Sequence, residues 1–396
     1  MRVGVDATSW VNRRGYGRFT RNVVTKLIEL DPETTYVLYI DDQTAAEAEL
    51  PARAAQRRIS LRHPPSEAAR ADSSRNLRDM FRLTRAVRRD QLDAFLFPSI
   101  YTYFPVVGLP TIVGIHDAIP EQFPQLTMPS RRALALWRLK QAIALRRASR
   151  IFTVSEASRE VLAERLGLEP ERVAIVSEAP DPVFFPRPQA QIAKAATAIG
   201  LEADEPYFFY AAGISPHKNV EGLVEAYAAV QVRRADAPRL VLVGDLGERE
   251  TFVSSADSVR ARIAANGIEH AVLLPGFVSD EQLACLYSGA IAAVIPSLAE
   301  GFGLPAVEAA ACGAPVLLSD LPAHRESLGD AALYFPAEDR AALASLLERF
   351  MDDEDLRGRA GREGRRAVAR LSWDSAARSL GQLISETVVV AWNGKR

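Results

Sequence analysis

The amino-acid sequence predicts an α/β protein built from two Rossmann-like, doubly wound domains. Short runs rich in branched apolar residues, such as "RLVLVGD" and "AAVIPS", alternate with longer helical patterns, as in parallel sheets covered by helices. The pattern occurs before and again after the proline-rich segment "EAPDPVFFPRPQ" (178–189), which we interpret as a linker. A chain of 396 residues, 48% hydrophobic and 25% charged, has globular composition and favours two domains.

The first domain is expected over residues 1–185. Its predicted strands are "RVGVDAT", "TYVLYID", "AFLFPS", "TIVGIHD" and "RIFTVS". A helix is expected over "RFTRNVVTKLIEL" after the loop "RRGYG", and an Ala/Arg-rich helical stretch is expected to run to about residue 90.

The second domain is expected over residues 186–373. Its predicted strands are "PYFFYAAG", "RLVLVGD", "AVLLPG", "AAVIPS" and "PVLLSD", and Ser279 with Gln282 forms a capping box between two of them. Because parallel sheets bind ligands beyond the carboxyl ends of their strands, we expect the two domains to face each other across a ligand-binding cleft.

The segment "EGFGLPAVEAAACG" (300–313) is predicted to form a glycine-rich loop and a helix. It follows the predicted strand "AAVIPS"; Pro305 suits the first position of a helix, and Gly313 suits a left-handed helix stop. Glu300 then lies in the loop and Glu308 lies one turn into the helix.

This segment has the chemistry of a site for an anion flanked by hydroxyl groups. Gly301 and Gly303 leave backbone N–H groups unhindered, and the helix dipole adds positive potential, so we expect a diphosphate there. Glu308 is expected to accept hydrogen bonds from ribose hydroxyls, and Glu300 from hydroxyls on the other side of the anion. The alternative is two solvent-facing glutamates, but the complete spacing favours a function.

A second candidate lies in "AAGISPHKN" (211–219), between a predicted strand and a helix. Lys218 stands at the helix N-terminus, where the dipole disfavours a cation by ~0.3–1 kcal/mol unless an anion binds. His217 can donate to the same anion, charged or neutral. The alternative is an exposed lysine in a turn.

The first domain offers a weaker candidate at the end of the predicted strand "TIVGIHD". His116 is expected to face the cleft, and Asp117 either to orient it or to cap the next turn. The acidic runs "IDD" (40–42) and "DDED" (352–355) are interpreted as a turn and solvated surface, because no further ligand spacing supports a metal.

Together these residues resemble the retaining, nucleotide-sugar-dependent glycosyltransferases of family 4, which have the GT-B fold. The resemblance covers nearly the whole chain. Its motifs fall on Glu300 and Glu308 (E-x7-E), Lys218 (diphosphate clamp), Gly15 and Gly17 (first-domain glycine loop) and His116 (cleft histidine). The segment "LSWDSAARSLGQLI" resembles the start of the family's last helix, expected over about 374–392, which crosses back to the first domain.

The resemblance implies transfer of a hexose from a nucleoside-diphosphate sugar to a hydroxyl acceptor, with no cofactor beyond the nucleotide sugar. The implied donor-binding residues are Gly15, Gly17, Gly213, His217, Lys218, Phe277, Val278, Glu300, Gly301, Phe302, Gly303, Leu304 and Glu308. His116, Lys218 and Glu300 are the implied catalytic residues, and Asp117 is an acceptor-binding candidate. Lys218, His217 and the helix N-terminus would stabilise the leaving diphosphate in place of a metal.

Two positions depart from the family pattern. His217 stands where the clamp has an arginine, so a permanent positive charge is missing and binding is expected to depend on pH. Arg14 stands where the N-terminal loop has its first glycine, and it could reach an anionic acceptor.

Basic residues concentrate in the first domain, although the net charge of the chain is −2. The segment 129–150 carries seven basic residues and no acidic one. Its larger apolar residues include Leu134, Trp137, Ile143 and Leu145. We expect this segment either to lie on an anionic membrane, near a lipid-linked acceptor, or to pack its apolar side on the sheet. Nucleic-acid binding is disfavoured, because aromatic residues are not interleaved as stacking platforms.

Several features favour a cytoplasmic protein, peripheral at the inner face of the membrane if segment 129–150 binds lipid. Cys285 and Cys312 show neither disulfide nor metal spacing. "MRVGVDAT" lacks the apolar region of a signal peptide, and no stretch approaches the ~18–20 apolar residues of a membrane span.

Other functions are open to a chain of this kind. A sugar-nucleotide 2-epimerase has a similar fold but needs no acceptor, and a related phosphorylase would need pyridoxal phosphate or inorganic phosphate. A non-catalytic sugar-nucleotide-binding protein need not keep Glu300, Glu308 and Lys218 together. The donor base, the sugar, the acceptor and the oligomeric state are left open.

Overall fold

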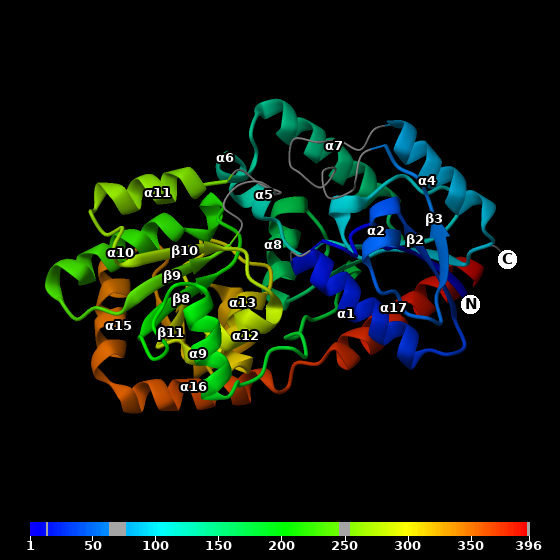
Figure 1. The fold of residues 1–396 in the computed structure, drawn as a ribbon. Helices are drawn as coiled ribbons and strands as arrows, with labels where there is room; N and C mark the ends of the chain where they lie inside the picture. The colour runs from blue at the N-terminus through cyan, green and yellow to red at the C-terminus, as the bar shows by residue number, and fades with distance from the viewer. Residues whose placement is uncertain (13–14, 63–76, 245–253, 394–396) are drawn as a thin grey trace. The chain divides into compact units, whose positions relative to one another are not determined.

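The computed structural model describes residues 1–12, 15–62, 77–244 and 254–393 of a chain that forms two compact units (Figure 1). Unit 1 comprises Met1–Glu178 together with Ser372–Arg396, and unit 2 comprises Ala179–Leu371. The chain therefore leaves unit 1 after residue 178 rather than 185, and returns to it after residue 371 rather than 373.

Unit 1 is built on a parallel sheet whose described strands follow the order β3-β2-β1-β4-β5-β6-β7. They are β1 (Arg2–Asp6), β2 (Thr35–Ile40), β3 (Ala55–Arg58), β4 (Ala94–Phe97), β5 (Thr111–Gly114), β6 (Arg150–Thr153) and β7 (Val173–Ile175). The five strands predicted for this domain are confirmed as β1, β2, β4, β5 and β6. The order reverses between β1 and β4, a point where doubly wound sheets bind ligands.

Helices cover the sheet of unit 1. They are α1 (Gly15–Leu30), α2 (Asp42–Glu47), α4 (Leu77–Arg89), α5 (Ile119–Gln122), α6 (Pro124–Thr127), α7 (Arg131–Arg147), α8 (Glu156–Leu166) and α17 (Trp373–Asn393), with short 3₁₀ turns at Ile100–Thr102 and Pro170–Arg172. Leu83 of α4 and Ala144 of α7 share one core with the sheet, whereas α17 packs along α1 on the other side (Figure 1). The last helix therefore returns to the first domain, as the resemblance implies.

The edge strand β3 replaces part of the helical stretch that was expected to run to residue 90. All four residues of β3 are exposed, so the segment has no apolar pattern that could reveal a strand. It is held instead by its ladder with β2 and by ion pairs of Arg57 with Asp90 and of Arg58 with Asp42. Helix α4 ends at Arg89, close to the expected limit, and residues 63–76 lie outside the described part of the chain.

Helix α7 turns an apolar face outward that differs from the one considered for a membrane contact. Leu134, Trp137 and Leu145 are half buried. Trp137 and Leu145 pack against the core, and the Trp137 Nε1–H donates to Glu121 at 2.6 Å. Of the four apolar residues expected on a membrane face, Ile143 alone is exposed. The apolar side of the helix does pack on the sheet, but a second apolar stripe remains exposed.

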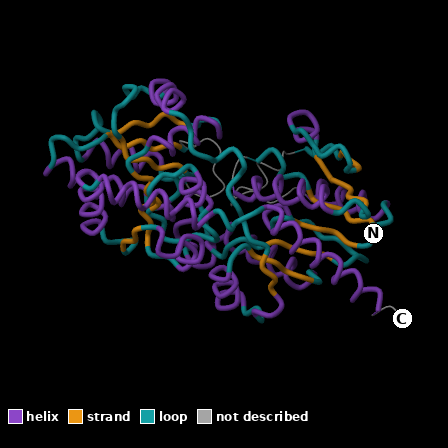
Figure 2. Tube along the Cα trace, turned by 90° about the horizontal axis from the view of Figure 1, so that it is seen from below, coloured by secondary structure: helices purple, strands orange, loops and turns teal. Residues whose placement is uncertain are grey.

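Unit 2 is built on a parallel sheet whose described strands follow the order β10-β9-β8-β11-β12-β13. They are β8 (Tyr207–Ala211), β9 (Arg239–Val243), β10 (Val272–Gly276), β11 (Ala292–Ile295), β12 (Val316–Ser319) and β13 (Leu333–Phe335). The five predicted strands are confirmed, and β13 is an addition at the edge. Figure 2 shows the strands of each unit as one layer flanked by helices.

The helices of unit 2 are α9 (Gln189–Ala198), α10 (Val220–Arg233), α11 (Ala256–Ala265), α12 (Asp280–Gly289), α13 (Leu304–Ala311), α14 (Pro322–Leu328), α15 (Arg340–Asp352) and α16 (Glu354–Val368), with 3₁₀ turns at Pro216–Lys218 and Gly329–Ala331. The capping box of Ser279 and Gln282 begins α12 as predicted. None of the helices in the described ranges of either unit is long and apolar enough to cross a bilayer.

Candidate functional site

The strongest constellation lies in unit 2, where the strand order reverses between β8 and β11. Lys218 follows β8 and Glu300 follows β11, and the carboxyl ends of these adjacent parallel strands meet at one edge of the sheet. The Lys218 Nζ lies 2.7 and 2.9 Å from the two carboxylate oxygens of Glu300. The Ser297 hydroxyl donates to Oε1 of Glu300 at 2.7 Å. The structure thus joins two residues that the sequence placed 82 positions apart.

The Lys218–Glu300 pair is largely shielded from water. The side chains are 15% and 7% exposed, respectively. Burial by itself would raise the pKa of Glu300, but the ammonium group of Lys218, together with His324 and the Ser297 hydroxyl, holds the pKa below its ordinary value. Glu300 is therefore ionised at neutral pH. The Lys218 ammonium and the Glu300 carboxylate stabilise each other, because a buried charge without a partner of opposite sign is costly.

The loops that carry this pair are tied to each other. The backbone N–H of Leu298 donates to the carbonyl of His217 at 2.8 Å. Asn219 adopts a left-handed conformation with φ of 53°, and its amide donates to the carbonyls of Pro296 and Ala337. Asparagine tolerates this conformation better than most residues. The asparagine in "SPHKN" was therefore the sequence feature that could have indicated a left-handed turn at this position. The ties fix Lys218 opposite Glu300.

His217 is buried beside Lys218, and its charge state differs from the one anticipated. Burial, and then the nearby Lys218 charge, lower the pKa of His217 to about 3. The imidazole is therefore neutral at physiological pH, and Lys218 is the cation of this loop. The pH dependence expected from His217 would lie far into the acid range.

The glycine-rich loop ends at Gly303, which caps α13 with φ of 88°. A side chain at Gly303 would be strained, and its Cβ would lie 2.9 Å from Cδ2 of His324. Helix α13 begins at Leu304, so Pro305 is its second residue rather than its first, and Gly313 stops it with φ of 81°, as predicted.

His324 is a residue of this region that sequence reasoning missed. It is fully buried in α14, and its Nδ1 lies 2.8 Å from the carbonyl oxygen of Ser319 at the end of β12. Its ring edge lies against Gly303, so it packs on the end of the glycine-rich loop. The signal was a histidine just beyond a predicted strand, the same signal that singled out His116.

The other residues predicted to bind the donor are spread along the same edge of unit 2. Phe302, Leu304 and Glu308 are buried, Gly301 is half buried and Gly213 is exposed. Phe277 is exposed and Val278 is buried; both follow β10, which β9 separates from β8.

The candidates in unit 1 are built around His116, which follows β5. Its Nε2 lies 2.8 Å from the carbonyl oxygen of Pro98, and its Nδ1 lies 3.8 Å from the carboxylate of Glu178. Burial lowers the pKa of His116 to about 4, so the ring is neutral, with Nε2–H donating to Pro98. Asp117 accepts from the Ile119 N–H at 3.0 Å and thus caps the next turn, one of its two expected roles. Sequence reasoning missed Glu178.

Gly15 and Gly17 lie in the first turn of α1. A Cβ at Gly17 would lie 2.1 Å from the backbone oxygen of Asn12, so this position requires glycine. The Arg21 guanidinium donates to the carbonyls of Trp10 and Asn12 at 2.7 Å each and holds the same loop. Arg14 lies outside the described residues.

A Gly17→Ala substitution is expected to lower the free energy of unfolding by about 1–3 kcal/mol or more, because the clash is with backbone rather than with a flexible side chain. Urea unfolding would measure this. Gly358→Ala is the matched control, since a Cβ there meets only the mobile end of Arg362 at 3.3 Å and alanine favours a helix. Equal stability of the two variants would contradict the requirement for glycine.

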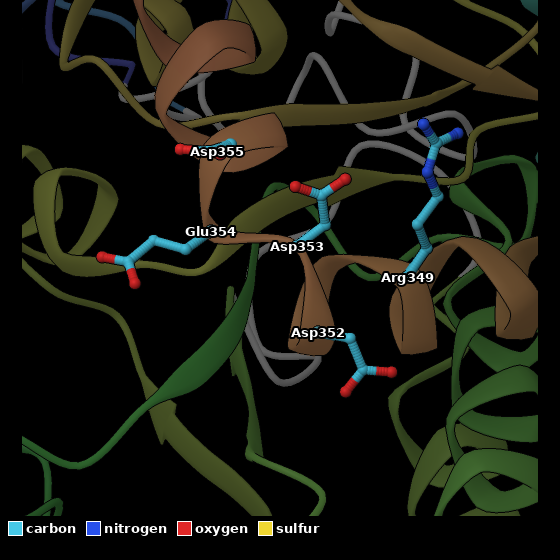
Figure 3. Close-up of a pocket in the computed structure, with 5 residues that line it drawn as sticks. All are labelled: Arg349, Asp352, Asp353, Glu354 and Asp355. Atoms are coloured by element: carbon cyan, nitrogen blue, oxygen red, sulfur yellow. The ribbon is translucent and has the colours of Figure 1, made fainter.

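The acidic run at 352–355 lines an open pocket with Arg349, shown in Figure 3. Asp352 forms an ion pair with Arg234 at 2.9 Å, and Asp353 caps α16 through the N–H of Leu356. These are structural roles on the surface. No group of three or more potential metal ligands occurs in the described ranges.

Two Rossmann-like units, one of which places a lysine and a glycine-rich helix start at its switch point, define the GT-B class of fold. Comparison with known families gives the same answer. Residues 13–182 match the model of Glycosyltransferase Family 4, and residues 192–367 match that of Glycosyl transferases group 1. The chain belongs to the family 4 glycosyltransferases.

Individual relatives and structures agree with this assignment. The chain is 29% identical over 229 residues to O-antigen chain mannosyltransferase B of Escherichia coli, covering 58% of each chain. It is 33% identical over 237 residues to MMP alpha-(1->4)-mannosyltransferase of Mycolicibacterium hassiacum, covering 59% of this chain and 53% of that one. The matches thus span little more than half of these two relatives.

Solved structures show a similar fold over the whole chain. Sucrose-phosphate synthase from Thermosynechococcus elongatus has a TM-score of 0.76 at 19% identity, covering 98% of this chain and all of that one. HepE of Anabaena, solved with UDP and glucose, has a TM-score of 0.72 at 16% identity, covering 97% and 99%.

Proposed function

We propose that this protein is a retaining glycosyltransferase that moves a hexose from a nucleoside-diphosphate sugar to a hydroxyl acceptor without a metal. The observation that carries the proposal is the buried Lys218–Glu300 pair beside the N-terminus of α13. A cation and the positive end of a helix dipole suit a diphosphate, and a carboxylate suits sugar hydroxyls. The names of the two mannosyltransferase relatives and the UDP and glucose bound to HepE support this choice of donor.

The reaction breaks the bond between the anomeric carbon and the phosphate oxygen and forms a bond to the acceptor oxygen on the same face. The departing phosphate oxygen takes the proton from the acceptor hydroxyl. Lys218 and the N–H groups at the start of α13 stabilise the charge that develops on the leaving diphosphate, so that no metal is required. Neutral His217 adds a hydrogen bond at most.

His116 is proposed to position the sugar. Because its Nε2–H is committed to Pro98, Nδ1 is left as an acceptor that a sugar hydroxyl can use. Glu308 is proposed to bind the ribose, Phe277 and Val278 the base, and Asp117 the acceptor.

The proposal extends to location. Cys285 and Cys312 are both free and buried, which supports a reducing compartment such as the cytoplasm. The acceptor is a glycan, a lipid-linked sugar or a small molecule, and peripheral contact with an anionic membrane would give access to a lipid-linked one.

The test is release of nucleoside diphosphate from UDP-, GDP- and ADP-sugars in EDTA, with and without crude glycan or lipid acceptors. We expect one donor to be consumed in EDTA when an acceptor is present, and His116→Ala to lower the rate. Full activity of His116→Ala would remove its positioning role.

Other outcomes would identify other functions. An isomeric nucleotide sugar formed without acceptor would indicate an epimerase. Nucleotide binding without turnover of any donor, with every acceptor fraction tried, would indicate a binding protein.

A further inference from the structure

The outward face of α7 carries an apolar stripe that the described residues of unit 1 leave exposed. Leu136, Leu139 and Ile143 are 44%, 58% and 37% exposed. Their spacing of three and four residues puts them on one side of the helix, where Ala135 and Ala142 are exposed as well. A buried helix would turn such a stripe inward.

Arginines surround this stripe. Arg131 and Arg132 lie at the start of α7, Arg138 in its middle, and Arg146 and Arg147 at its end, all exposed. Helix α7 contains no acidic residue. The stripe is therefore apolar along its centre and positive at both ends.

Helix α4 extends the same surface. Its Leu83 and Val87 enter the core that receives Ala144 of α7, so both helices lie on one side of the sheet (Figure 1). The outward side of α4 carries Phe81, which is 66% exposed, and five exposed arginines at positions 78, 82, 85, 88 and 89. The one acidic residue of α4, Asp79, is buried and receives the backbone N–H of Arg62. We call these exposed residues of α4 and α7 the α4–α7 surface.

A hollow of about 500 Å³ adjoins the stripe. It is lined by Ala142, Ile143, Leu145, Arg146, Leu166 and Leu168. The side chains are aliphatic apart from one arginine, so the apolar character continues from the convex face of α7 into a recess. Such a shape can accept loosely packed apolar groups.

We propose that the α4–α7 surface docks on a bilayer of anionic phospholipid. The leucines, Ile143 and Phe81 enter the boundary between headgroups and acyl chains, while the arginines contact lipid phosphates. A second copy of this chain fits the surface less well, because a two-fold contact would bring arginines against arginines. The inference specifies the membrane contact included in the proposed function and rests on it.

The test is flotation of the intact protein with vesicles of phosphatidylcholine, with or without about 30 mol% phosphatidylglycerol. We expect flotation only with the anionic vesicles, and a large reduction at about 0.5 M salt, which screens exposed charges. Equal flotation with both vesicles, or none with either, would overturn the proposal.

Two variants and a control locate the surface. Leu136→Glu/Leu139→Glu and Arg146→Gln/Arg147→Gln are each expected to weaken vesicle binding roughly tenfold or more. Val232→Glu in unit 2 is the control, since Val232 is 88% exposed and lies outside the surface. Flotation of either double variant equal to that of Val232→Glu would overturn the assignment, as would a dimer of the native protein that Leu136→Glu/Leu139→Glu abolishes.

The failure of this inference can be distinguished from failure of the proposed function. Consumption of nucleotide sugar with a water-soluble acceptor is expected to be unchanged in both double variants. Turnover without flotation would refute the docking surface alone. Flotation without turnover of any donor would refute the transferase and leave the surface in place.

Discussion

A Lys218→Met variant is expected to lose about a hundred- to a thousandfold in kcat, because it removes the cation that we propose stabilises the leaving diphosphate. The preceding residue cannot replace it, since the lowered pKa of His217 keeps that imidazole neutral. The measurement is nucleoside diphosphate release at saturating donor, with KM determined in parallel. A loss confined to KM would mean that Lys218 binds the donor equally in the ground and transition states.

The controls for this variant separate the role of Lys218 from general loss of a lysine. Lys26→Met removes an exposed lysine paired with Glu29 at 2.7 Å in unit 1, and it should leave kcat unchanged. Lys218→Arg keeps the charge but changes its geometry, so partial activity is expected. If Lys218→Met retained native kcat, the electrostatic role of Lys218 would have to be abandoned.

The second large effect is a loss of stability that becomes smaller as pH falls. Lys218→Met leaves the Glu300 carboxylate buried without a cation, which is expected to lower the free energy of unfolding by about 3–5 kcal/mol at pH 7. In the native protein the pKa of Glu300 is lowered, so its contribution is present above the ordinary pKa and is lost as pH falls through the lowered one. In the variant the two contributions of Lys218 are lost, so burial, the largest single influence on Glu300, is expected to move that pKa upward. The variant should therefore approach native stability as pH falls toward the ordinary carboxyl range.

Urea unfolding of both proteins between pH 4 and pH 8 would show whether their stabilities converge as pH falls. The double variant Lys218→Met/Glu300→Gln removes both charges and should recover much of the lost stability at pH 7 without recovering activity. A deficit in Lys218→Met that is independent of pH would show that lost packing, rather than the stranded carboxylate, causes it.

Sequence patterns sufficed for the buried strands and failed for the short outer ones. The ten predicted strands are confirmed because each is a compact apolar run. Nine of them lie inside a parallel sheet, and β10 lies at an edge and is partly buried. All residues of β3 are exposed. Strands β7 and β13 have three residues each, and in each strand a single residue is buried. Strands of this kind are specified by pairing with a neighbour, which no local window of sequence contains.

At the site, residue types were easier to predict than partners. Lys218 and Glu300 were each singled out by local helix electrostatics and spacing, but their ion pair depends on β8 lying next to β11. His324 was not predicted, because its role comes from a contact with Gly303 in another segment of the chain. Helix α7 has apolar residues on two sides, so its sequence could not indicate which side the sheet would cover.

The last helix gives the chain an unusual order of assembly during translation. Unit 1 begins at the N-terminus, but the partner of α1 is α17, whose Trp373, Leu380 and Ile384 are buried. All of unit 2, Ala179–Leu371, must leave the ribosome before α17 does. One side of α1 in the nascent first unit therefore stays uncovered until the whole second unit has been synthesised. Of the two units, the one whose synthesis starts first is therefore completed last.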